Sequence, residues 1–191
     1  MTTLVCDFSN PEAVEGVLTE QLPTDVKIDG FVNNAAMAYD DLITNMNPNR
    51  LQQMFQVNVL APIALTKQCI RRMLLHGTRG SIVHVSSISV HTGYKGLSMY
   101  AATKGALEAF SKNAAREWGS LGIRSNCVVA GFMETDMSAT LSTEQKQKIL
   151  NRTALRKATS LDSVASTISY LLSSKSDSIT GQNVFVDSGT I

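Results

Sequence analysis

Short apolar runs alternate along this chain with longer segments of helical periodicity, and this alternation limits the possible folds more than any other feature. The longer segments repeat apolar residues three and four positions apart, as the buried face of a helix does. Strands that alternate with helices form a parallel sheet with helices on both faces. The sequence therefore predicts a doubly wound, Rossmann-like α/β fold, and its 191 residues suffice for a single domain, 1–191. The predicted strands cover residues 3–6, 28–32, 81–86, 123–129 and 184–187.

Capping residues and prolines set the ends of the predicted helices. Asn10 or Ser9 caps the first helix, which ends before Pro23. Pro62 lies inside the second helix, and because proline has no amide proton, the carbonyl of Asn58 loses its helical donor. Either that carbonyl holds a water molecule, or Pro62 only bends the helix around the core. The predicted helices cover residues 10–22, 47–75, 98–118 and 161–172, with a short helix inside the loop 132–155.

The composition narrows the class of protein. With 43% hydrophobic and 17% charged residues, the chain has an ordinary globular composition. A net charge of +1 gives no indication of a nucleic-acid partner or a membrane surface. No apolar run approaches the length that spans a bilayer. Cys6, Cys69 and Cys127 are too widely spaced for a metal cluster or a disulfide framework, so we expect no metal site and a reducing, cytoplasmic location.

Tyr100 and Lys104 are four residues apart in the predicted helix 98–118, so their side chains share one face. A free tyrosine has a pKa of about 10, and a neighbouring cation can lower it by roughly 1–3 units. The pair could then transfer a proton to or from an alcohol or ketone oxygen. Many surface helices carry the same pair without any function, so the pair alone does not establish a site.

Polar residues follow three of the predicted strands, at Asn33-Asn34, Ser86-Ser87 and Gly131. In parallel sheets, ligands bind outside the carboxyl ends of the strands. Each cluster alone is more often a turn than a site. Because they converge on one edge, with Tyr100 and Lys104 just after one of them, the sequence predicts a binding crevice there.

Five motifs spaced along the chain, in the order in which the family carries them, resemble the short-chain dehydrogenase/reductase family. The resemblance is to the 3-oxoacyl-[acyl-carrier-protein] reductase type in particular. Residues 100–104 match its Tyr-x-x-x-Lys signature, and Ser87 stands thirteen residues earlier, where the family has its catalytic serine. Asn58 matches the fourth catalytic residue of the family. Residues 33–36 are Asn-Asn-Ala-Ala, where the family has Asn-Asn-Ala-Gly. Residues 123–126 and 131–135 match the family segment that contacts the nicotinamide and the pyrophosphate. Residues 180–189 match the carboxy-terminal strand of the family.

The resemblance implies an interconversion of ketone and alcohol by hydride transfer from a nicotinamide cofactor. Tyr100 would be the general acid in reduction or the base in oxidation, and Lys104 would lower the pKa of Tyr100 and hold the cofactor ribose. Ser87 would bind the substrate oxygen, and Asn58 would hold a water that connects Lys104 to solvent. NADP(H) is favoured over NAD(H). The expected cofactor contacts are Asp7, Asn33, Ala35, Tyr100, Lys104, Gly131 and Thr135.

The substrate implied by the resemblance is a small carbonyl or alcohol compound, which an acyl carrier could deliver. The methionines and leucines of 132–155, Met137 among them, suit an apolar or acyl group, although a buried core would use the same residues. Family members commonly assemble through the helices at 47–75 and 98–118 and the last strand, so we expect a homo-oligomer, a tetramer or a dimer. His76 and His84 are expected to be structural. The expected substrate pocket includes Ser89, His91, Tyr94, Phe132 and Met133.

The chain departs from the family pattern in two places. Ala130 replaces the usual proline before Gly131. The family begins with a strand and a glycine-rich turn, but no Gly-x-x-x-Gly-x-Gly precedes residue 30 in this chain. Asp7 already matches the acidic residue that follows the family's third strand. At ~30 residues for one strand–helix–strand unit, on the order of 50 residues of the family pattern would be absent. The strand at 28–32 would then have an open edge, and the strand at 3–6 would lose its neighbour.

Three explanations of the second departure are open. The sequence is a fragment or begins at the wrong methionine, which we favour; or it is a stretch of a longer chain; or it is a truncated, inactive subunit that binds and regulates a full-length relative. The matches at Ser87, Tyr100, Lys104 and Asn58 argue against the inactive subunit, which has no chemical need for all four.

Overall fold

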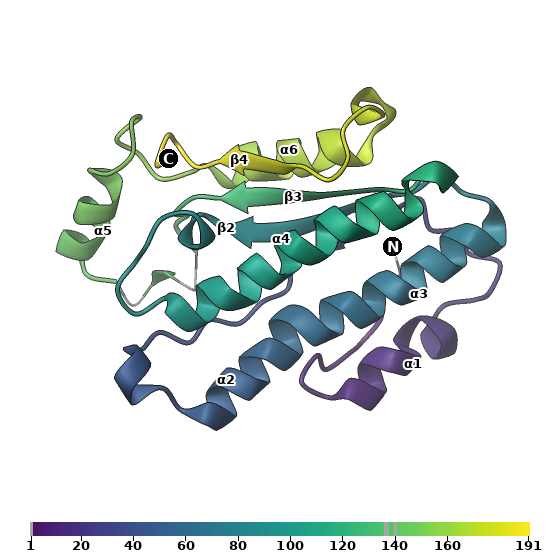
Figure 1. The fold of residues 1–191 in the computed structure, drawn as a ribbon, viewed down its shortest axis with the longest axis horizontal. Coiled ribbons are helices and arrows are strands. Elements are labelled where there is room, and N and C mark those ends of the chain that lie inside the picture. Colours follow the sequence, from purple (N-terminus) through teal and green to yellow (C-terminus); the bar gives the residue numbers. More distant parts are fainter. Residues whose placement is uncertain (1, 136–137, 140) are drawn as a thin grey trace.

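A parallel sheet of four strands forms the centre of the computed structural model, which describes residues 2–135, 138–139 and 141–191 (Figure 1). The strands lie side by side in the order of the sequence. Each neighbouring pair is parallel and in register, with Phe31 beside Ile82 and Val83 beside Asn126. The predicted α/β class and parallel sheet are confirmed. The strands are β1 (Gly30–Asn33), β2 (Ser81–Ser87), β3 (Arg124–Ala130) and β4 (Asn183–Val186).

Helices cover both faces of this sheet (Figure 1). On one face Ile82 packs with Ile70 and Met73 of α3. On the other face Val83 packs with Val164 and Leu171 of α6. Successive residues of β2 therefore face opposite layers, and both layers are apolar. The helices are α1 (Pro11–Gln21), α2 (Pro48–Phe55), α3 (Ala61–His76), α4 (Ser98–Trp118), α5 (Thr143–Leu150) and α6 (Leu161–Leu172).

The prediction of a strand at residues 3–6 is wrong. Residues 2–7 have no strand beside them in the part of the chain that the structure describes. The backbone of Val5 instead pairs with the side chain of Gln21, which accepts from its N–H at 3.0 Å and donates to its carbonyl at 2.8 Å. Leu4 and Cys6 pack against the cluster that α1 and α3 form. The apolar run is therefore held by packing against α1 and α3 and by the side-chain amide of Gln21, and not by hydrogen bonds to a neighbouring strand.

The helix predicted over 47–75 is divided at the expected place. Between α2 and α3 the segment Gln56–Leu60 is a π-helix, in which the N–H of Ala61 donates to the carbonyl of Gln56. Such widened turns interrupt α-helices and often mark functional sites. Here the π turn contains Asn58, and Pro62 follows in the first turn of α3. None of the described helices combines the length and apolarity that a membrane crossing requires.

Candidate active site

The end of β2 and the start of α4 bring together three of the predicted catalytic residues. Ser87 is the last residue of β2, and Tyr100 lies in the first turn of α4. Lys104 follows one turn later and is only 3% exposed. Its ammonium donates to the carbonyl of Val85 at 2.8 Å and lies 5.8 Å from the centre of the Tyr100 ring. A serine hydroxyl, a phenol and an ammonium thus meet at the carboxyl edge of the sheet.

The pKa values at this edge differ from the prediction. Burial raises the pKa of Tyr100 to about 12, the charge of Asp40 adds to the rise, and hydrogen bonding with Ser87 opposes it. Burial also lowers the pKa of Lys104 to about 8. The predicted lowering of the phenol pKa by Lys104 is therefore wrong for the protein alone. The lysine is held by β2, and loss of solvent around the phenol outweighs any effect of its charge.

Ser89 orients the candidate catalytic serine. Its backbone N–H and its hydroxyl both donate to the Ser87 oxygen, at 3.2 and 3.0 Å. Because the two bonds use the acceptor sites of that oxygen, the proton of Ser87 is available to another acceptor. Ser89 was predicted to line the substrate pocket. In the structure Ser89 is buried, and its two hydrogen bonds hold the Ser87 hydroxyl in position.

Asn58 joins three parts of the chain. Its side chain accepts from the N–H of Met37 and donates to the Met37 carbonyl, both at 2.8 Å, and it also donates to the Thr103 hydroxyl at 3.1 Å. The side chain is fully buried. Asn58 therefore fixes the loop after β1 against α4, one residue before Lys104. Thr103 is a site residue that sequence reasoning missed, although it lies inside the Tyr-x-x-x-Lys motif.

Asn33, at the end of β1, makes its contacts inside the protein. Its amide nitrogen donates to the Thr66 hydroxyl at 3.1 Å and lies 2.9 Å from His84 Nδ1, which assigns the histidine proton to Nε2. His84 is fully buried, and burial lowers its pKa to about 4, with the charge of Lys104 adding to the shift. No partner within the described ranges reaches His84 Nε2. His84 is structural, as predicted, and the Asn33 side chain holds β1 to β2 and α3.

Glu108 is a buried carboxylate that the sequence did not single out. It lies one turn after Lys104 on α4 and accepts from His91 Nε2 at 2.9 Å and from the Asn183 amide at 2.6 Å. The Ser86 hydroxyl also donates to it. His91 was predicted to line the substrate pocket, but its ring is held between Glu108 and Phe185, whose ring centre lies 4.8 Å away. The four-residue spacing from Lys104 is the signal that could have found Glu108.

Tyr94 borders a shallow, mainly apolar hollow of about 390 Å³, formed with residues 41–44, 95, 96 and 98. The guanidinium of Arg152 lies 5.0 Å from the centre of its ring. Met133 packs instead against the core cluster beside α6, and the Phe132 carbonyl accepts from the N–H of Thr159 at 2.8 Å. Of the residues predicted to line the substrate pocket, Tyr94 is the one that borders this hollow. Met137 lies outside the described residues.

The remaining predicted cofactor residues occupy turns. A Cβ at Gly131 would lie 2.6 Å from the Asp187 backbone and 2.5 Å from the Thr159 hydroxyl, so only glycine fits there. The N–H of Thr135 donates to Ser138 at 3.0 Å. Asp7 accepts from the N–H and the hydroxyl of Ser9, which lowers the pKa of its carboxyl. Ala35 lies in the loop that Asn58 anchors at Met37.

A parallel sheet with helices on both faces, and a serine, a tyrosine and a lysine at its carboxyl edge, define a Rossmann-like oxidoreductase. Residues 1–190 match a family model described as enoyl-(acyl carrier protein) reductase. Together with the relatives below, this match shows that the chain belongs to the short-chain dehydrogenase/reductase family of oxidoreductases.

Similar proteins include the 3-oxoacyl-[acyl-carrier-protein] reductase FabG of Salmonella typhimurium, which is 32% identical over 97% of this chain and 76% of its own length. Carbonyl reductase [NADPH] 2 of Sus scrofa is 35% identical over 97% of this chain and 75% of its own length. A gluconate 5-dehydrogenase from Burkholderia cenocepacia, solved with NADP and tartrate, superposes with a TM-score of 0.93 at 25% identity, over 98% of this chain and 74% of that one.

Proposed function

We propose that this chain is an NADP(H)-dependent oxidoreductase that interconverts a ketone and a secondary alcohol, and that it reduces a 3-oxoacyl or similar carbonyl substrate. The observation that carries the proposal is the juxtaposition of Ser87, Tyr100 and Lys104 at the carboxyl edge of the sheet. The names of the similar proteins support the substrate class and the cofactor.

In the proposed reduction, Tyr100 is the general acid. Because the pKa of its phenol is raised to about 12, the phenol carries its proton at neutral pH and can give it to a developing alkoxide. Ser87, held by Ser89, donates its free proton to the same substrate oxygen and fixes its position. A bound nicotinamide cofactor would supply the hydride for this reduction.

Lys104 fits the cofactor ribose by its hydrogen-bonding capacity. An ammonium has three protons, and the Val85 carbonyl accepts one of them at 2.8 Å. Two donors are then available for ribose hydroxyls. The pyrophosphate has no comparable partner in the first part of the chain, since the glycines of residues 2–30 are Gly16, inside α1, and Gly30, in β1. The described residues therefore fit the nicotinamide end of the cofactor.

The hollow beside Tyr94 supports an apolar substrate. It is bordered by the partly exposed side chains of Leu42 and Ile43, which are 42% and 73% exposed. Such a surface beside the catalytic edge would accept the acyl chain of a 3-oxoacyl thioester. A carrier protein could present that chain from outside.

We further propose a homo-oligomer, a tetramer or a dimer. The supporting observation is the exposure of large apolar side chains on α3 and β4, where Leu75 is 73% and Phe185 43% exposed. Large apolar side chains that are exposed in the single chain are the ones that an association surface would cover. Analytical ultracentrifugation measures the mass directly, and a monomer at micromolar concentration would contradict this part of the proposal.

Removal of the phenol oxygen of Tyr100 tests the proposed reaction. Tyr100→Phe should lower kcat for NADPH-dependent reduction of a 3-oxoacyl thioester at least a hundredfold, a typical contribution of a general acid. NADPH affinity, followed through Trp118 fluorescence, should stay within threefold. Tyr170→Phe removes the hydroxyl of a tyrosine that is 44% exposed, and it is the matched control, with unchanged turnover expected. If Tyr100→Phe keeps a tenth or more of the turnover, Tyr100 is not the acid.

A further inference from the structure

Arg152 lies over an aromatic ring at the catalytic edge of the sheet. It follows α5, which lies beyond the carboxyl ends of β2, β3 and β4 (Figure 1). Its guanidinium carbon is 5.0 Å from the centre of the Tyr94 ring. Tyr94 is half-buried and borders the apolar hollow that the proposed function assigns to the substrate. A cation is therefore held beside that hollow.

Backbone hydrogen bonds fix both members of this pair. The N–H of Leu97, the N-cap of α4, donates to the Tyr94 carbonyl at 3.2 Å. In the turn after α5, the N–H of Ala154 donates to the Gly189 carbonyl at 2.8 Å. Tyr94 is thus tied to the start of the helix that carries the candidate catalytic residues, and Arg152 to the turn after β4. The pair is positioned before any ligand arrives.

The guanidinium of Arg152 has donors available for a ligand. Within residues 2–135, 138–139 and 141–191, no carboxylate lies within 4.0 Å of it. The charge of Asp187 reaches the Tyr94 phenol, but its carboxylate accepts from the N–H groups of residues 189–191, at 3.0 to 3.1 Å. Five N–H groups lie in the plane of a guanidinium, and two of them can bind a carboxylate or a phosphate in parallel.

The Tyr94 phenol adds a further donor. Burial raises its pKa, while the charge of Arg152 opposes the rise and that of Asp187 adds to it. The phenol therefore keeps its proton at neutral pH. A hydroxyl donor and a guanidinium then lie together at the border of the hollow.

The charges at this edge favour an anion at Arg152 and not at the reacting carbonyl. Burial raises the pKa of Tyr100, and the negative charge of Asp40 raises it further, so a second negative charge is disfavoured beside that phenol. Lys95 and Asp41 both line the hollow, and their charges balance. Arg152 is left as the unbalanced cation beside the hollow.

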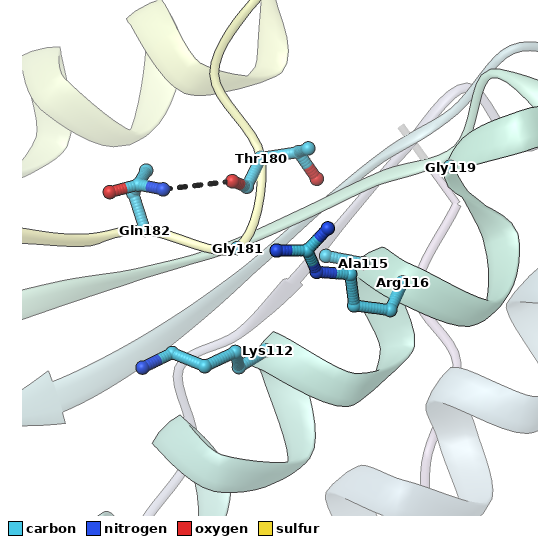
Figure 2. Close-up of a pocket in the computed structure, with 7 residues that line it drawn as sticks. All are labelled: Lys112, Ala115, Arg116, Gly119, Thr180, Gly181 and Gln182. Atoms are coloured by element: carbon cyan, nitrogen blue, oxygen red, sulfur yellow. Dashed lines mark hydrogen bonds between the residues drawn. The ribbon is translucent and has the colours of Figure 1, made fainter.

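Another pair of exposed cations lies at the opposite edge of the sheet, in a hollow of about 610 Å³ (Figure 2). Lys112 and Arg116 of α4 face the turn before β4 there. We expect copies of the chain to assemble through α4 and the last strand, so the exposure of these cations in a single chain shows no free site. The turn after α5 and the loop before α4 lie outside the elements expected at that interface.

We propose that Arg152 binds a carboxylate or a phosphate group of the carbonyl substrate, at a distance from the reacting ketone. This inference rests on the proposed reductase function and narrows its substrate class to anionic carbonyl compounds. The carboxylate would come from a free oxo acid, and the phosphate from the carrier of a thioester such as a coenzyme A ester. In both cases the apolar part of the substrate lies in the hollow, and Arg152 is the residue that selects for charge.

Two matched pairs of ketones test this selection. 4-Oxopentanoate and its methyl ester differ in the carboxylate, while acetoacetyl-coenzyme A and S-acetoacetyl-N-acetylcysteamine differ in the phosphates. With NADPH, Arg152→Gln should raise KM at least tenfold for the anionic member of one or both pairs, with kcat within threefold, because it removes binding that ground state and transition state share. KM for the neutral members should stay within twofold. The affected pair identifies the free oxo acid or the phosphate-bearing carrier as the source of the anion.

Lys148→Gln removes another exposed cation, on α5, and is the matched control, with all four KM values expected within twofold of the original protein. Circular dichroism verifies that both variants are folded. Equal changes in KM for the anionic and neutral members, or the same changes in Lys148→Gln, would overturn the proposal, because they would show a structural role or a merely basic surface.

A titration without NADPH separates this inference from the proposed reaction. Added to the ¹⁵N-labelled protein at low salt, the anionic ketones that depend on Arg152 should shift its Nε–H signal and the Tyr94 amide signal, and their neutral counterparts should not. If none of the four ketones is reduced, the proposed reductase function fails, but the titration still decides whether Arg152 binds the anion. No shift at Arg152 with either anionic ketone would overturn the inference.

Discussion

The Lys104 ammonium donates to the Val85 carbonyl at 2.8 Å and lies 5.8 Å from the centre of the Tyr100 ring. The lysine is thus anchored to the end of β2 rather than to the phenol. Burial has an opposite effect on the two groups, because it disfavours the charged form of each. It raises the pKa of Tyr100 to about 12 and lowers that of Lys104 to about 8. The site therefore maintains a protonated acid next to a cation that is costly to bury.

The cost of burying Lys104 predicts a variant that is more stable but inactive. The pKa of Lys104 falls from 10.5 to about 8, so its charged form destabilises the fold below pH 8, and the effect disappears as the pH rises to 10.5. Lys104→Met should raise the free energy of unfolding at pH 7 by about 1–3 kcal/mol, less than the full shift because the Val85 carbonyl loses its donor. Urea denaturation at pH 7 and pH 10 measures this, and the two proteins should become equally stable at the higher pH. A less stable variant at pH 7 would contradict the prediction.

The same shift sets the pH dependence of the proposed reduction. Above about pH 8 Lys104 loses its proton and with it the charge that would hold the cofactor ribose, while Tyr100 keeps its proton. We expect kcat/KM to fall about tenfold per pH unit above that point. Initial rates between pH 6 and 10 test this, with cofactor affinity measured over the same range. A flat profile up to pH 10 would show that the charge of Lys104 is not needed.

His84 should make the fold sensitive to acid. Burial lowers its pKa from 6.5 to about 4, so the unfolded chain binds a proton between these values and the folded chain does not. Stability is therefore lost as the pH falls from 6.5 to 4, by at most about 3 kcal/mol from this group. Between pH 6.5 and 4, the free energy of unfolding of His84→Gln should fall by about 2 kcal/mol less than that of the original protein. The carboxylates titrate in both proteins, so the difference between their urea transitions isolates His84, and equal losses would exclude its role.

Asn58 should contribute stability through its contacts with Met37. Asn58→Ala removes a fully buried side chain and leaves both backbone groups of Met37, which is half-buried, without their side-chain partner. We expect a loss of about 2–4 kcal/mol in the free energy of unfolding. Hydrogen exchange of the Met37 amide should become faster as well. Asn49→Ala, at an exposed position of α2, is the control, and it should change neither measurement. Unchanged exchange at Met37 would show that another contact holds the loop.

Local sequence determines the elements that are long and periodic. The bounds of α4 and α6 agree with the prediction because each has a continuous apolar face and a clear end. The apolar run at 3–6 has the same composition as a strand, but a strand also needs a neighbouring strand, which no local pattern specifies. Composition alone therefore assigned it wrongly.

The candidate site shows the same limit. The motif at 100–104 and Ser87 could be read from the sequence because short spacing along one helix and the end of one strand place them together. The raised pKa of Tyr100 could not be read, since it depends on how many residues cover the phenol. The place of His91 could not be read either, because its partners Glu108 and Phe185 lie on α4 and β4. Long-range packing decides such contacts.

Glu108 should be the polar residue on which the loop between Ser87 and Tyr100 depends. Its carboxylate accepts hydrogen bonds from the end of β2, from His91 in that loop and from Asn183 on β4. Glu108→Ala leaves all three donors without an acceptor, and we expect the free energy of unfolding to fall by about 2–4 kcal/mol. Glu108→Gln keeps the volume and one acceptor oxygen, so its loss should be roughly half as large. Glu117→Ala, at an exposed position of the same helix, is the control and should leave the urea midpoint unchanged. If Glu108→Ala is as stable as this control, the network does not hold the loop, and Ser87 must be positioned by Ser89 alone.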